Sequence, residues 1–195
     1  MLSTASIRSK VTFSKNLITD QTWSGFVRAL NTSLAFDVTE GFGQAADASS
    51  IILINAGGFN DQKITGSLKW VLPTLITGYD VGVIARVQGI LTTGGATANF
   101  YYARCDGDVA KLTKVVANTY TNLSTNAFVL PINTAVEVIL SCVGSTISAT
   151  YTCAGVPGSP LTLTATDTSI TTGGLMGMRS LTSSVWFRSF TAEEL

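Results

Sequence analysis

The residue types that this chain lacks restrict its chemistry as much as those it contains. The sequence has no histidine, which excludes Ser-His and Cys-His nucleophile pairs, zinc sites of the His-Glu-x-x-His type and any histidine general base. Glu137 is the one glutamate that alternation places inside a predicted strand, opposite its apolar face. Because a lone carboxylate cannot serve as both acid and nucleophile, we interpret Glu137 as an ordinary solvent-facing residue.

Carboxylates and thiols elsewhere in the chain also have simple structural explanations. The motif Asp106-Gly107-Asp108 offers oxygens for calcium, but calcium needs six or more ligands, and Asp-Gly is itself a strong hairpin-turn signal. Cys105, Cys142 and Cys153 are odd in number, lack metal-type spacing and fall on apolar faces. We therefore predict a turn and three small core residues, with no metal site, cofactor or disulfide framework.

Four residues are the candidates for contact with a sugar or a protein partner: Arg86, Tyr102, Arg104 and Trp186. Aromatic rings stack on sugar faces, and guanidinium groups donate several hydrogen bonds. The alternative is that Tyr102 and Trp186 belong partly to the core and that the arginines only keep the sheet soluble. The sequence leaves both interpretations open.

The clearest element is a predicted hairpin over residues 136–153, in which apolar residues alternate with others up to a two-residue Gly144-Ser145 loop. This register places four pairs on one apolar face: Cys142 with Ile147, Leu140 with Ala149, Val138 with Tyr151, and Val136 with Cys153. Cys142 and Cys153 are then about six residues of strand apart, roughly 20 Å, which is too far for a disulfide.

A second predicted hairpin centres on Asp106-Gly107, with residues 100–105 running in and 108–116 running out. One face carries Tyr101, Ala103, Ala110 and Leu112. The other face collects a mixed aromatic and basic strip, made of Phe100, Tyr102, Arg104, Lys111 and Thr113. A strand face that contacts only solvent does not require such a strip, so we take this strip as the first candidate binding surface.

The remaining segments also favour strands. The segment 81–88 alternates and leads through a Gly94-Gly95 loop into the strand at 100–105, so that three strands follow in meander order. Further strands are predicted at 64–72, 161–166, 174–179 and 185–190, with 167–170 as a connection. Before residue 51 we expect a strand pair over 26–36 and a loop at 41–43. That loop and Gly57-Gly58 lack the residues of a phosphate-binding motif.

Composition sets the class of protein. The 195 residues are 46% hydrophobic and only 12% charged, with formal net charge zero. This predicts one domain over residues 11–195 after an N-terminal arm, 1–10, and no nucleic-acid partner. The longest apolar run, 51–54, is too short to span a membrane. The N-terminus lacks a signal-peptide core, so we expect the protein to be made in a host cytoplasm.

The order of motifs resembles a known superfamily over the last two thirds of the chain. The motifs are Gly82-Val83-Ile84-Ala85-Arg86-Val87, Phe100-Tyr101-Tyr102-Ala103-Arg104, Asp106-Gly107, Lys111-Leu112, Val136-Glu137-Val138-Ile139-Leu140, Gly144, Ile147-Ser148-Ala149-Thr150-Tyr151, Asp167-Thr168-Ser169-Ile170, Gly173-Gly174-Leu175-Met176-Gly177-Met178 and Val185-Trp186-Phe187-Arg188-Ser189-Phe190. Together they resemble the concanavalin A-like lectin/glucanase superfamily in its laminin G-like form. The resemblance implies an all-β fold of two antiparallel sheets in a jelly-roll sandwich, whose concave face often holds the ligand.

Members of this superfamily include lectins, glucan hydrolases, adhesion modules and phage particle proteins, so fold alone does not name a function. The first hypothesis is a non-enzymatic structural protein of a virus (phage) particle, a capsid decoration or tail appendage subunit that contacts other particle proteins and copies of itself. The alternative is a carbohydrate-binding or adhesion module. A glycan hydrolase ranks last, because the Glu-x-Asp motif of the retaining glucanases is missing.

Overall fold

The structure is a computed structural model that describes residues 26–29, 34–37, 42–45, 50–54, 59–70, 80–89, 98–180 and 185–195. Every regular element in these ranges is a strand, and they contain no helix that is long and apolar enough to cross a membrane. The predicted arm at 1–10 and the predicted loops at 57–58 and 94–95 lie outside the described residues.

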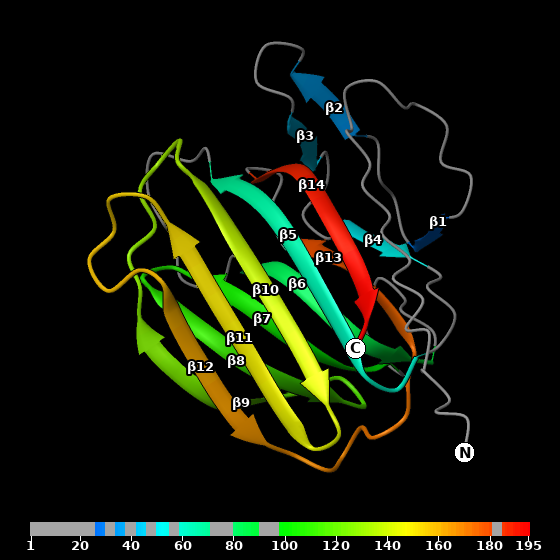
Figure 1. Ribbon diagram of the computed structural model, residues 1–195. Coiled ribbons are helices and arrows are strands. Elements are labelled where there is room, and N and C mark those ends of the chain that lie inside the picture. The colour runs from blue at the N-terminus through cyan, green and yellow to red at the C-terminus, as the bar shows by residue number, and fades with distance from the viewer. Residues whose placement is uncertain are drawn as a thin grey trace, which may run out of the picture.

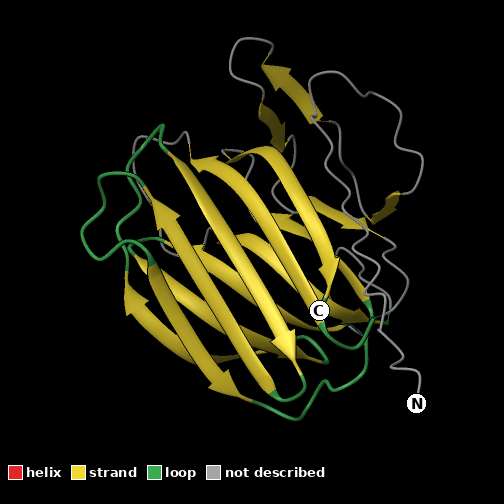
Figure 2. Ribbon diagram, in the orientation of Figure 1, coloured by secondary structure: helices red, strands yellow, loops and turns green. Residues whose placement is uncertain are grey.

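Two seven-stranded sheets pack face to face (Figures 1 and 2). Sheet A has the order β1-β4-β13-β6-β7-β8-β9, with bounds β1 Phe26–Ala29, β4 Ser50–Ile54, β13 Leu175–Ser180, β6 Asp80–Gln88, β7 Asn99–Asp106, β8 Val109–Val116 and β9 Thr119–Ala127. Sheet B has the order β12-β11-β10-β5-β14-β3-β2, with bounds β12 Leu161–Thr166, β11 Thr146–Cys153, β10 Ala135–Val143, β5 Gln62–Trp70, β14 Val185–Glu194, β3 Phe42–Ala45 and β2 Leu34–Asp37. The predicted all-β, concanavalin A-like jelly-roll sandwich is confirmed.

The core lies between the sheets and is built from the alternation that the sequence shows. Val83, Ala103 and Leu112 of sheet A are fully buried against Val138 and Leu140 of sheet B. Each strand contributes every second residue to this layer, because successive side chains of a strand point to opposite faces. Roughly 25 cal/mol is gained for each Å² of apolar surface that the layer removes from water.

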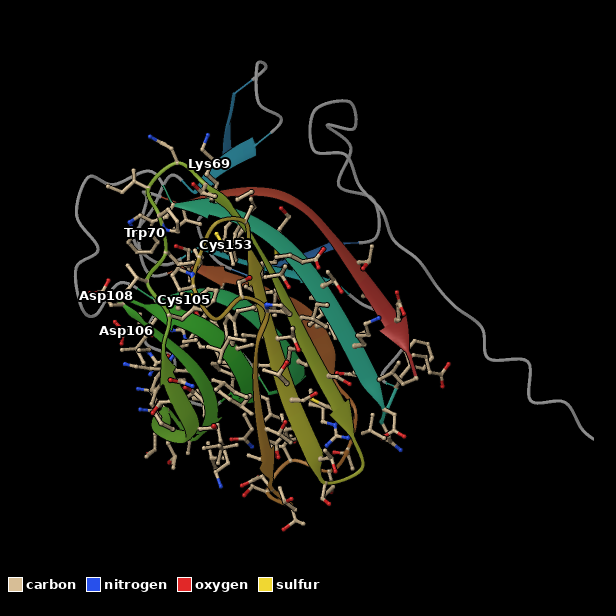
Figure 3. The ribbon with its side chains drawn as sticks, turned by 60° about the vertical axis from the view of Figure 1, so that its left-hand side comes forward. Lys69, Trp70, Cys105, Asp106, Asp108 and Cys153 are labelled. Atoms are coloured by element: carbon tan, nitrogen blue, oxygen red, sulfur yellow. The ribbon has the colours of Figure 1, made fainter. Side chains whose placement is uncertain are left out.

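The hairpin predicted over 136–153 is confirmed in register. Val136 pairs with Cys153, Val138 with Tyr151, Leu140 with Ala149 and Cys142 with Ile147. Cys105, Cys142 and Cys153 are buried free thiols, as predicted. Burial raises the pKa of the Cys105 and Cys142 thiols, which keeps both protonated and poorly nucleophilic. Figure 3 shows Cys105 and Cys153 at the same end of the sandwich as Asp106 and Asp108.

The meander β6, β7, β8 is also confirmed, but the hairpin loop is Gly107-Asp108 rather than Asp106-Gly107, because Asp106 pairs with Val109. Two predictions near the N-terminus were wrong. Residues 26–36 are not a strand pair, because β1 belongs to sheet A and β2 to sheet B, and alternation does not say which partner a strand takes. Residues 41–43 are not a loop, because β3 begins at Phe42, and Gly43 pairs with both Phe36 and Phe187. Long-range pairing holds this glycine in a strand despite its weak propensity.

Candidate functional site

Arg86, the first predicted contact residue, is not at a binding surface. Its side chain is fully buried. Nε donates to the Asn60 carbonyl oxygen at 2.9 Å, and Nη1 donates to the carbonyl oxygens of Gly144 at 2.8 Å and Ile170 at 2.9 Å. The guanidinium thus joins three connections at one end of the sandwich, and we call this set of bonds the Arg86 knot. The prediction that Arg86 offers its donors to a ligand is corrected accordingly.

A β-bulge is the reason that alternation failed at Arg86. The residue has φ 51°, and the pairing of β6 with β7 shifts between Ala85 and Gln88. The shift inserts one residue, so that Val87, rather than Arg86, joins Ile84 in the apolar cluster on the outer face of sheet A. The backbone N–H of Arg86 donates to Gln62 Oε1 at 2.7 Å, which fixes the bulge against β5.

Trp186 lies in the other sheet from Tyr102 and Arg104. Its backbone pairs with Lys69 of β5 and Gln44 of β3, in sheet B, and its side chain is outside the described residues. The structure therefore brings together Tyr102 and Arg104 only, on neighbouring outward positions of β7. The four candidates therefore do not form one surface, because sequence alternation does not assign strands to sheets.

The outer face of sheet A, away from the main core, holds rows of side chains set by the strand register. In one row Arg179 of β13 and Arg104 of β7 flank Gly82 of β6, and Lys111 of β8 follows Arg104. Gly82 contributes no side chain between the two arginines, and a Cβ there would lie 1.9 Å from the Ala103 carbonyl oxygen. The two arginine positions are therefore about 9.6 Å apart, two strand spacings.

Arg104 is the centre of this face. Its guanidinium forms an ion pair with Asp80 and lies 3.8 Å from Asp106 Oδ2. Nε donates to Thr113 Oγ1 at 3.0 Å, and Nη2 donates to Asn122 Oδ1 at 3.2 Å. Lys111 pairs with Asp106 from the adjacent strand. Charge-assisted bonds of this kind hold a buried guanidinium in one orientation.

Arg179 has a different environment. It is 9% exposed, and its guanidinium carbon lies 5.5 Å from the ring centroids of each of Phe100, Tyr102 and Tyr120. Nη1 donates to the Tyr120 hydroxyl. The Tyr102 hydroxyl donates to the backbone oxygen of Arg179 at 3.3 Å. Three ring faces therefore surround one cation, an arrangement favoured by the ring quadrupoles.

Two buried polar atoms on this face have no hydrogen-bond partner, Asp80 Oδ1 and Arg179 Nε. Asp80 is 3% exposed. Burial raises the pKa of Asp80, and the contact with Arg104 offsets that rise only in part. An unpaired buried polar atom is costly, so such atoms in a native fold call for a physical explanation. We refer to Asp80, Tyr102, Arg104, Tyr120, Asn122 and Arg179 as the outer-face cluster.

Sequence reasoning found two members of this cluster and missed the other four. Tyr102 and Arg104 were visible from the alternation of one hairpin, and Thr113, which was predicted to share their face, pairs with Tyr102. Asp80, Tyr120, Asn122 and Arg179 come from β6, β9 and β13, whose register against β7 is set by long-range pairing. The one available signal was the aromatic residue in the uncharged segment at 119–127.

A second polar cluster lies outside this face. Asp167 Oδ1 accepts from the Tyr101 hydroxyl at 2.7 Å, and its Oδ2 accepts from Lys114 Nζ at 2.7 Å. Lys114 Nζ is also 2.8 Å from Ser169 Oγ. Although Asp167 is partly buried, these hydrogen bonds lower its pKa to about 2. Lys114 is in an ion pair with the carboxylate, so we interpret the cluster as structural.

Among the described residues, no three Asp, Glu, Cys or His side chains are placed to hold a metal ion. No protein-family model and no curated protein matches the sequence. Solved structures do match the fold. Carbohydrate-binding module CBM66 from Bacillus subtilis aligns with TM-score 0.61 and 15% identity over 87% of this chain and 95% of that chain.

Two further structures cover most of both chains. Peanut lectin aligns with TM-score 0.66 and 11% identity over 94% of this chain and 96% of its own. The CBM2 module of the evolved Dit of Lactobacillus casei BL23 phage J-1 aligns with TM-score 0.57 and 10% identity, over 94% and 96%. Identities this low show a shared fold and leave function to be argued from the site.

Proposed function

We propose that the protein is a non-enzymatic carbohydrate-binding module and that its site is the outer-face cluster. The observation that carries this proposal is the gathering of aromatic rings, guanidinium groups and a carboxylate on one sheet face, where Asp80 Oδ1 and Arg179 Nε lack partners. Sugar hydroxyls both donate and accept hydrogen bonds, and the C–H faces of sugars stack on aromatic rings. Two similar structures, a carbohydrate-binding module and a lectin, support the same function.

Tyr120 and Asn122 are the members of the cluster that solvent reaches most easily. Tyr120 is 37% exposed, and Asn122 is exposed on the same edge strand, β9. A glycan approaching sheet A would meet these two side chains before the buried arginines. They are therefore the right residues to remove in a test of binding, because their loss leaves the ion pair of Arg104 with Asp80 in place.

The test is binding of the purified protein to an array of plant, bacterial and animal oligosaccharides, followed by calorimetry on the best ligand. Tyr120→Ala and Asn122→Ala are each expected to weaken affinity about tenfold or more, since each removes on the order of 1.4 kcal/mol of contact. Asn126→Ala is the matched control. Asn126 is exposed on the same strand but pairs with Ala110, a core residue, so it belongs to the opposite side of the sheet.

The proposal fails if no oligosaccharide binds, or if a ligand binds equally well to the Tyr120→Ala and Asn122→Ala proteins. In the second case the sugar site lies elsewhere on the molecule. Loss of binding in Asn126→Ala to the same extent as in Asn122→Ala would also count against the outer-face cluster, because it would point to a general effect on β9.

A second candidate function is that of a subunit in a virus particle, as capsid decoration or tail appendage. The similar phage Dit module is the observation that favours it. The two functions are compatible, since a particle protein can carry a glycan-binding module. We propose a test of the mass in solution by light scattering, with and without residues 1–10. An oligomer lost on deletion supports the subunit function, and a monomer that the deletion leaves unchanged counts against self-assembly through the arm.

A further inference from the structure

The outer-face cluster has an uneven distribution of charge. Arg104 has two carboxylates nearby, Asp80 and Asp106, and Lys111 also pairs with Asp106. Among the residues that the structure describes, Arg179 makes no ion pair within 4.0 Å, and its contacts are the Tyr120 hydroxyl and three aromatic rings. Arg179 is therefore the cation of this face that has no ion pair within 4.0 Å, although Asp80 is near enough to interact with it electrostatically.

The burial of Arg179 makes the absence of an ion pair unfavourable for this side chain. The side chain is only 9% exposed, so most of its hydration is lost. Nε has no acceptor. Removing a charge from water without a full set of partners is unfavourable, whereas a guanidinium and a carboxylate form short, paired, charge-assisted hydrogen bonds. A ligand carboxylate at Nε would accept the hydrogen bond that Nε now lacks, and it would also neutralise the positive charge of the Arg179 guanidinium.

The second unpaired atom limits the chemistry of the ligand further. Asp80 Oδ1 is a buried acceptor on the strand between the two arginines, and it needs a donor. Gly82, two residues along β6, places no side chain between Arg179 and Arg104. A ligand that satisfies both atoms carries a carboxylate and, within about one sugar ring of it, a hydroxyl. Uronic acids and other acidic sugars have this combination.

We infer that the site takes an acidic glycan, with the sugar carboxylate on the Arg179 guanidinium and a neighbouring hydroxyl donating to Asp80. This inference rests on the proposed glycan-binding function and names its ligand class. Tyr120 controls access. Its ring lies 5.5 Å from the Arg179 guanidinium carbon and 5.7 Å from that of Arg104, and it is the exposed ring of the three around Arg179. Outward rotation of Tyr120 releases Nη1 for the ligand.

The test compares each acidic oligosaccharide with its own carboxyl-reduced form, so that only the charge and its oxygens differ. The probes are oligogalacturonate, oligoalginate and sialyllactose, measured by calorimetry. We expect at least one acid to bind about tenfold or more tightly than its reduced form, and this preference to shrink as salt concentration rises. Arg179→Gln should abolish the preference while binding of the reduced form changes little.

Lys63→Gln is the control for net charge. Lys63 pairs with Glu193 at 3.6 Å in sheet B and should leave the preference intact. If Arg179→Gln does not fold, as judged by thermal unfolding, the salt dependence of the wild-type preference decides the question. Equal affinity for acid and reduced forms overturns the acidic-ligand inference and leaves glycan binding standing. An absence of binding to any sugar on the array overturns the proposed function itself, and the inference with it.

Discussion

Arg86 and Arg104 are buried arginines on adjacent strands of one sheet, yet their partners differ in kind. The hydrogen bonds from Nε and Nη1 of Arg86 end on backbone carbonyl oxygens of three separate connections, at residues 60, 144 and 170, and Nη2 lies 3.5 Å from Asp61 Oδ1. The donors of Arg104 end on side chains, those of Asp80, Thr113 and Asn122. The bonds of Arg86 hold three connections against the sandwich, whereas the bonds of Arg104 form a polar cluster on the outer face of sheet A.

The difference shows how to distinguish a structural arginine from a binding one. Backbone carbonyls of packed connections are fixed, so the Arg86 knot has no freedom to exchange a partner for a ligand. The outer-face cluster has two unpaired atoms, Asp80 Oδ1 and Arg179 Nε, and it includes the exposed Tyr120. Arg86 Nη2 also lacks a hydrogen-bond partner, but it is fully buried and lies 3.5 Å from Asp61 Oδ1. Burial alone would not separate the two cases, because Arg86, Arg104 and Arg179 are all at most 9% exposed.

The largest effect is expected for Arg86→Ala. This change leaves the three carbonyls without donors inside the protein, which should lower the free energy of unfolding by more than about 3 kcal/mol. The measurement is the urea midpoint, with the slope of the transition unchanged, and glycan affinity of the folded protein should be retained. A variant of normal stability that no longer binds glycan would instead return Arg86 to the binding site.

The next effect in size is expected at Gly82, which lies between Arg179 and Arg104 of the outer-face cluster. A Cβ in Gly82→Ala meets backbone atoms of Ala103 and Arg104, which must move apart at a cost of about 2 kcal/mol. Thermal unfolding of the variant and the wild type measures this loss of stability. Gly144→Ala is the comparison, because its Cβ has open space and only the φ of 53° is unfavourable, at about 1 kcal/mol. Equal losses in both variants would argue against close approach at Gly82.

Asp167→Asn tests a support of the Arg86 knot, because Asp167 fixes the connection that supplies the Ile170 carbonyl. The folded-state pKa of Asp167, about 2, is below its ordinary value, so its stabilisation is present above pH ~4 and disappears as pH falls through ~2. We expect a loss of about 1 kcal/mol at neutral pH, vanishing in acid. The measurement is urea unfolding of Asp167→Asn and wild type at neutral and acidic pH, and a stability difference that persists unchanged in acid would contradict this role of Asp167.

The smallest effect is expected for Tyr120→Phe, measured by calorimetry with an acidic oligosaccharide. The ring stays, but Arg179 Nη1 loses its hydroxyl acceptor and becomes available to the ligand carboxylate. Affinity should rise about three- to fivefold, which corresponds to less than about 1 kcal/mol. A fall in affinity would mean that the hydroxyl itself contacts the sugar, and would remove the access step from the acidic-ligand inference.

Much of the fold was predictable because its strongest signals are local. The alternation from Val136 to Cys153 and the Gly144-Ser145 turn predict a register that the structure confirms pair by pair. The turn signal at Asp106-Gly107 likewise locates the hairpin of β7 and β8, although its two-residue loop is Gly107-Asp108. In both cases the turn and both strands lie within about twenty residues, so that turn geometry and period-two alternation specify the pairing together.

The site residues were predictable only where they lie on such a local hairpin. Tyr102 and Arg104 are on the hairpin that the sequence identifies, whereas Asp80 of β6 and Arg179 of β13 are almost 100 residues apart in the chain and come together because β13 pairs with β6. Arg86 was misassigned because one inserted residue changes which face each following side chain occupies. Nothing in the spacing around Arg86 marks that insertion.

The sequence by itself determined that this chain forms an antiparallel sandwich with thiols in its core and without histidine chemistry, since composition, turns and alternation act within short stretches of chain. Tertiary structure decided which strands share a sheet, where the bulge at Arg86 falls, and which cations find carboxylates. These depend on contacts between residues far apart in the sequence, whose energies arise only when the two sheets have paired and packed.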